Sequence, residues 1–133
     1  MGEELLVTER IDAGAEFVRD FNDYVTVSVA FWIVPAESDD VFLYVASDDI
    51  DDGNFDVAYG QALRKLSGKR SQWLDPFQIK LLNSSDPIAQ DAIRIRDRYP
   101  APLVTRYGGS SLGGTSIDGA CIYPPTAALM ATP

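Results

Sequence analysis

Polar and apolar positions alternate most clearly over residues 24–34, which indicates an extended strand. The positions between the valines and aromatics of one face are also small or apolar, so other parts of the chain can cover both sides of this strand. A polar loop at residues 35–40 follows, and the alternation resumes over residues 41–45, which predicts a hairpin. The residues expected to be most deeply buried include Val27, Val29, Phe31, Leu43 and Val45.

Three other segments carry apolar residues at the spacing of one helix face. They are residues 8–22, 55–66 and 87–99. The third has the clearest start, because Asp86 can cap a helix and Pro87 suits its first position, where a missing N–H costs nothing. These patterns predict three amphipathic helices.

Short apolar runs at residues 78–82, 103–107 and 117–123 read as further strands. The resulting order is helix, strand, strand, helix, strand, helix, strand, strand. This order predicts an α+β fold, with a mainly antiparallel sheet of about five strands and three helices packed against it. Residues 1–125 are expected to form a single α+β domain, and residues 126–133 a C-terminal tail.

The inventory of reactive side chains is narrow. The chain has no histidine, which excludes a Ser-His-Asp triad, a Cys-His dyad and a His-ligated zinc within one chain. Its one cysteine, Cys121, lies in an apolar run and is expected to be a buried, inert thiol. We therefore assign no catalytic residue, metal site or cofactor, and the sequence favours a protein that is not an enzyme.

An acidic stretch at residues 47–56 suggests a calcium loop, but its spacing does not fit one. With Gly53 as the sixth residue of such a loop, Ile50 occupies the third position, where an oxygen ligand is required. We interpret the stretch as a solvated loop that ends at a helix start.

Charge is distributed unevenly along the chain, whose net charge is -9. Residues 1–56 hold fifteen Asp and Glu against two Arg, whereas residues 57–133 hold nine Lys and Arg against five Asp. Opposite patches on two copies can meet, so we expect a protein partner or self-association as a homodimer. Nucleic-acid binding is not expected of so acidic a chain.

No apolar run approaches the roughly 20 residues that span a bilayer, so no membrane association is expected. The first residues lack the basic region of a signal peptide. The expected location is the cytoplasm.

The glycine-rich stretch between the last two predicted strands is the main candidate binding element. Paired glycines let backbone amides approach an anion, and hydroxyl groups and arginines nearby can add donors. The candidate ligand-binding residues are Arg94, Arg98, Arg106, Gly108, Gly109, Ser110, Ser111, Gly113 and Gly114. The competing interpretation is a turn between strands, with the arginines in surface ion pairs such as Asp91 with Arg94.

Two functions remain open on these observations. The first is a non-enzymatic protein-interaction or regulatory module, which the missing histidine and the segregated charge favour. The alternative is an enzyme or sensor that binds a small phosphate- or carboxylate-bearing ligand at the glycine-rich loop.

Overall fold

The computed structural model describes residues 6–67, 72–99 and 103–130, so the ends of the predicted domain and tail, residues 1–5 and 131–133, lie outside the described residues. The elements follow the predicted order with small additions. They are α1 (Thr8–Phe21), β1 (Val29–Pro35), β2 (Phe42–Ser47), α2 (Phe55–Ser67), the 3₁₀-helix η2 (Pro76–Gln78), β3 (Ile79–Asn83), α3 (Pro87–Arg96), β4 (Thr105–Tyr107), β5 (Ser111–Leu112), β6 (Thr115–Ile122) and α4 (Thr126–Met130).

The sheet confirms the predicted α+β class. Its strands lie in the order β3-β2-β1-β6-β4, and the short β5 pairs with β6, which makes six strands where about five were expected. Every pairing is antiparallel except that of β2 with β3. The parallel pair follows from the chain order, because the crossover through α2 returns the chain to the same end of the sheet.

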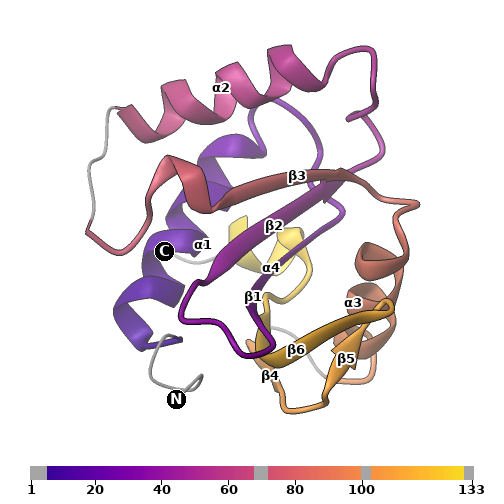
Figure 1. Ribbon diagram of the computed structural model, residues 1–133. Coiled ribbons are helices and arrows are strands. Elements are labelled where there is room, and N and C mark those ends of the chain that lie inside the picture. Colours follow the sequence, from indigo (N-terminus) through magenta and orange to yellow (C-terminus); the bar gives the residue numbers. More distant parts are fainter. Residues whose placement is uncertain (1–5, 68–71, 100–102, 131–133) are drawn as a thin grey trace.

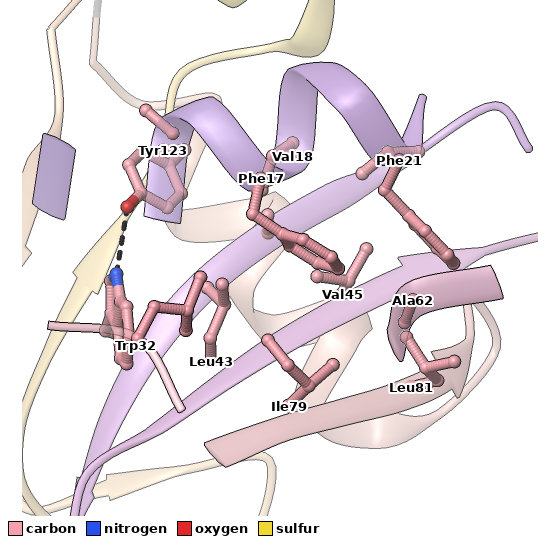
Figure 2. Close-up of a cluster of buried hydrophobic side chains, with 14 of the residues drawn as sticks. Phe17, Val18, Phe21, Trp32, Leu43, Val45, Ala62, Ile79, Leu81 and Tyr123 are labelled. Atoms are coloured by element: carbon pink, nitrogen blue, oxygen red, sulfur yellow. Dashed lines mark hydrogen bonds between the residues drawn. The ribbon is translucent and has the colours of Figure 1, made fainter. Parts of the chain in front are cut away.

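Helices cover both faces of the sheet (Figure 1). The larger core lies on the side of α1, α2 and α4, and Figure 2 shows part of it, including Phe17 and Phe21 of α1 and Leu43 of β2. The smaller core lies between the sheet and α3, around Phe31 and Ala92. β1 contributes to both cores, because its alternate residues point to opposite faces.

The residues predicted to be most buried are confirmed. Each of the five, from Val27 to Val45, is at most 4% exposed. None of the described helices combines the length and the apolar character that crossing a membrane requires.

β1 begins five residues later than the alternation suggested. The Val25 N–H donates to the Phe21 carbonyl, and the Val27 N–H donates to the Asn22 side chain at 2.9 Å. These bonds tie the segment that precedes β1, residues 24–28, to the end of α1. The N–H groups that make them are not available for pairing with another strand. The apolar alternation there reports burial rather than strand pairing.

The end of α3 and the C-terminal tail also differ from expectation. α3 stops at Arg96, three residues before the predicted end, and Tyr99 is 55% exposed. Part of the expected tail forms α4. Thr126 donates its hydroxyl proton to the Val27 carbonyl, Arg19 donates to the Leu129 carbonyl, and the Leu129 side chain is buried against the α1 side of the sheet.

Candidate functional site

The second half of the glycine-rich stretch forms the turn between β5 and β6. Gly113 and Gly114 have φ values of 56° and 85°, which suit the two-residue turns that join antiparallel strands. Gly113 also packs against α3: a Cβ placed there would lie 2.3 Å from the Ile88 Cα, and its N–H donates to Asp91 at 2.9 Å. This half of the stretch holds the hairpin against α3.

The first half lies beside Tyr107 on β4. The Tyr107 hydroxyl donates to the Ser111 carbonyl at 3.0 Å, and a Cβ at Gly109 would fall 2.3 Å from that hydroxyl. Ser110 and Ser111 are exposed, and Gly108 faces open space. Gly108 therefore leaves room for a ligand beside its backbone.

The three candidate arginines do not converge. Arg94 pairs with Asp91 on the exposed side of α3, which is the ion pair considered as the competing interpretation. Arg98 is exposed just past the end of α3, and its side chain makes no hydrogen bond or ion pair with the part of the chain described. Arg106 lies opposite Cys121 in the β4–β6 pairing, and Cys121 belongs to the core on the α1 side. Arg106 therefore points to the face of the sheet that α3 does not cover.

Arg106 and Gly108 do meet, in a small pocket of about 180 Å³ at the β4–β6 end of the sheet. We refer to it as the Arg106 pocket, and its other lining residues are Leu6, Tyr107, Asp118, Gly119 and Ala120. One guanidinium N–H of Arg106 donates to the Leu6 carbonyl at 3.2 Å.

Asp118 reaches this pocket because β6 is irregular there. Opposite β1, Val34 pairs with Gly119 and Pro35 pairs with Ile117, so Asp118 is the extra residue of a β-bulge. One carboxylate oxygen of Asp118 accepts from the N–H of Glu37, a residue with a φ of 55°. The bulge thus brings a carboxylate to the same pocket that Arg106 lines. The sequence offered no sign of this bulge.

The residue opposite Arg106 in the β4–β6 pairing, Cys121, carries a buried thiol. Burial raises the pKa of Cys121, and the nearby positive charge of Arg106 only partly opposes that rise. A protonated, buried thiol is a poor nucleophile. The structure thus gives the pocket two charged groups that can bind a ligand, the Arg106 guanidinium and the Asp118 carboxylate.

A second and larger hollow lies at the end of the sheet near the β1–β2 loop. It has a volume of about 520 Å³ and is lined by residues of α1, the β1–β2 loop, the start of β2 and η2. We name it the Phe77 groove. Its lining residues are Arg10, Asp39, Asp40, Val41, Phe42, Asp75, Phe77 and Gln78.

Phe77 is the most exposed of the large apolar side chains in the described chain, at 84%. Its backbone is nevertheless fixed: the Asp75 carboxylate accepts from the Phe77 N–H at 2.8 Å, and the Gln78 side chain accepts from the Asp75 N–H at 2.7 Å. This capping box holds the 3₁₀ turn and so presents the Phe77 ring to solvent from a constrained backbone.

Negative charge dominates the Phe77 groove. Asp39, Asp40 and Asp75 line it against the single guanidinium of Arg10. That guanidinium is already engaged, because it lies 5.7 Å from the Trp73 ring centroid and its Nε donates to the Trp73 carbonyl at 3.2 Å. Sequence reasoning missed this site because its residues come from three separated segments. The acidic pair at 39–40 and the aromatic bend at 73–77 were its only signals.

The acidic stretch at residues 47–56 is a hydrogen-bonded turn. The Asp51 carboxylate accepts from the N–H groups of Gly53 and Asn54, and the Asn54 side chain accepts from the Asp51 N–H at 2.9 Å. α2 starts at Phe55, directly after Asn54, so the stretch ends at a helix start as the sequence indicated. Within residues 6–67, 72–99 and 103–130, no group of three or more carboxylate or thiol side chains is arranged to hold a metal ion.

Comparison with known proteins adds no identification: the chain matches no protein-family model, no curated protein sequence and no solved structure.

Proposed function

We propose that this protein is a non-enzymatic interaction module that binds a basic segment of a partner protein in the Phe77 groove. The observation that carries the proposal is the exposed ring of Phe77, held by a capping box beside three carboxylates. Exposed aromatic residues in a hollow are typical anchors of protein interfaces.

The apolar part of the binding energy would come from covering Phe77 and the partly exposed Phe42. Burying a phenylalanine side chain contributes about 1.5–3 kcal/mol. Because hydrogen bonds already fix the backbone of η2, little conformational entropy is lost when a partner covers this ring.

The carboxylates of the Phe77 groove favour a basic partner. Asp39 and Asp40 are exposed, and neither side chain forms a hydrogen bond or ion pair within the described chain. The net charge of -9 attracts a basic segment from a distance. The Phe42 ring is already seen to accept a cation, since the Lys80 ammonium lies 5.0 Å from its centroid.

The same charges disfavour a symmetric contact of two such grooves. An isologous interface would place Asp39, Asp40 and Asp75 of one copy against the same residues of the other, and like charges repel. A homodimer, which the charge distribution along the sequence favours, would therefore use another surface. Self-association is a separate part of this proposal with its own test.

An amide NMR titration locates the binding site directly. The probe is a nonapeptide in which lysine alternates with leucine and phenylalanine, and its control replaces each lysine by glutamate. We expect the basic peptide to shift the amide signals of residues 39–42 and of Asp75, Phe77 and Gln78, and the acidic peptide to shift none of them. Shifts confined to the acidic turn at residues 48–54 would reject the groove as the site.

The alternative function, a small anionic ligand bound at the glycine-rich loop, has one observation in its favour. Two of its candidate residues, Arg106 and Gly108, line a common pocket. This is a separate site from the Phe77 groove, and the two proposals stand or fall independently.

A further inference from the structure

We propose that the Arg106 pocket binds a small carboxylic acid that also carries a hydrogen-bond donor, as α-amino acids and α-hydroxy acids do. The inference rests on the alternative function, a small anionic ligand at this loop, and names the chemical class of that ligand. It is independent of the Phe77 groove.

Arg106 supplies the site for the carboxylate. Its guanidinium uses one N–H on the Leu6 carbonyl and has no carboxylate partner within the described chain. The other N–H groups form a planar fork, a shape that matches the two oxygens of a carboxylate. An arginine at the edge of a pocket and without an acidic partner can therefore accept a ligand anion without first breaking an ion pair.

Asp118 restricts which anion fits. Its Oδ2 accepts from the Glu37 N–H at 3.1 Å, which leaves capacity to accept from a ligand. An ammonium or hydroxyl group on the ligand can donate to that carboxylate, whereas a phosphate dianion would be repelled by it. The pair of charges thus favours a ligand with an anionic end and a donor end over a simple anion.

The size of the pocket sets the scale of the ligand. At about 180 Å³ it is smaller than the roughly 300–1,000 Å³ typical of sites for drug-sized molecules. A Cβ placed at Gly108 or Gly119 would meet no atom within 4 Å, so each glycine leaves space above its backbone. A molecule of a few carbon atoms fits this description better than a nucleotide does.

A substitution at Gly119 can block the pocket while leaving the charged residues of the pocket in place. Gly119 does not have a positive φ, and nothing lies near its absent side chain, so Gly119→Val should fill the pocket without straining the fold. Arg106→Gln removes the guanidinium group that would bind the carboxylate of the ligand. Arg98→Gln is the matched control, because Arg98 is exposed and lies outside the pocket.

The test is a thermal-shift series with L-serine, D-lactate and inorganic phosphate as probes, each at a fixed pH and ionic strength. We expect serine or lactate at millimolar concentration to raise the melting temperature by about 2 °C or more, and phosphate to leave it unchanged. Arg106→Gln and Gly119→Val should abolish the shift, and Arg98→Gln should retain it. Circular dichroism of each variant shows whether it is folded.

Three outcomes would overturn the inference. A shift with serine or lactate that persists in both Arg106→Gln and Gly119→Val places binding elsewhere. A shift with phosphate alone, lost in Arg106→Gln, rejects the ligand class and keeps the anion site. No shift with any of the three probes rejects both the ligand class and the anion site for these small ligands.

Discussion

The Trp32 indole N–H donates a hydrogen bond to the Tyr123 hydroxyl at 2.8 Å, in the core on the α1 side of the sheet (Figure 2). The Tyr123 hydroxyl in turn donates to the Ile11 carbonyl of α1. Both side chains are at most 1% exposed. This chain of hydrogen bonds joins β1, the end of β6 and α1, and it satisfies the two polar atoms that the core would otherwise bury unpaired.

Gly14 allows α1 to lie against this pair. A Cβ at Gly14 would fall 2.4 Å from the Tyr123 hydroxyl oxygen and 2.7 Å from the Trp32 Nε1. We expect Gly14→Ala to lower the free energy of unfolding by about 1–3 kcal/mol, because the added methyl group must displace a packed, hydrogen-bonded pair. Urea unfolding followed by circular dichroism measures this change.

Gly60 on α2 is the matched control for that substitution. A Cβ there would meet no atom within 4 Å, so Gly60→Ala should raise stability by about 0.5–1 kcal/mol through helix propensity alone. Equal effects of the two substitutions would show that α1 does not pack against Trp32 and Tyr123 as described.

Tyr123→Phe tests the hydrogen bonds themselves, and their pH dependence. Burial raises the pKa of the Tyr123 hydroxyl above its ordinary value of 10.0. Below about pH 10 the hydroxyl is protonated in both the folded and the unfolded chain, so it adds no pH dependence. Above that pH only the unfolded chain releases the proton, and the free energy of unfolding falls by up to about 1.4 kcal/mol per pH unit.

We therefore expect two results from Tyr123→Phe. At about pH 7 the variant should lose about 1–3 kcal/mol, because the Trp32 N–H loses its buried partner. Between about pH 10 and pH 11 its stability should fall less steeply than that of the unmodified protein. Parallel curves over this interval would mean that Tyr123 is ionised as readily in the folded state as in the unfolded one.

Much of the fold could be predicted because its signals are local. The alternation through Phe31, the Asp86–Pro87 helix start and the glycine after β5 each report a structure within a few residues. Asp86 does cap α3, accepting from the Ile88 N–H at 3.1 Å. The parallel pairing of β2 with β3 and the Trp32–Tyr123 contact join distant segments, and no local pattern specifies them.

The candidate site was harder to predict for the same reason. Paired glycines suggested an anion loop, but Gly113 is needed for a positive φ and for close contact with α3. Arg94, Arg98 and Arg106 are close in sequence, yet Arg94 and Arg106 belong to opposite sides of the sheet. Asp118 enters a pocket only because of a bulge, which a single sequence does not reveal.

Gly113→Ala tests the structural role of the glycine-rich turn. Its φ of 56° disfavours any side chain, and the added Cβ would lie 2.3 Å from the Ile88 Cα, which is backbone and cannot rotate away. We expect a loss of about 2–4 kcal/mol in urea unfolding, from strain and overpacking together. Gly114→Ala is the control: it has a positive φ but open space around it, so its cost should be about 1 kcal/mol.

Self-association is tested by light scattering at tens of micromolar protein. A homodimer held by complementary charge should dissociate as ionic strength rises from about 0.05 M to about 0.5 M, because the Debye length shortens to a few ångströms. A dimer held by apolar burial should persist over that range. A monomer mass at every salt concentration would reject the homodimer.

Binding of a basic segment by Phe77 and its neighbouring carboxylates is measured through the affinity of the fluorescein-labelled basic nonapeptide, by fluorescence anisotropy. We compare Phe77→Ser and the double variant Asp39→Asn, Asp40→Asn with a charge-matched control, Asp48→Asn, Asp52→Asn, which alters two exposed carboxylates away from the groove. We expect each groove variant to weaken binding by about tenfold or more, a loss of about 1.4 kcal/mol, and the control to retain affinity within about twofold. If the two double variants weaken peptide binding equally and Phe77→Ser binds as tightly as the unmodified protein, the peptide responds to net charge alone. That result would reject the Phe77 groove as the binding site.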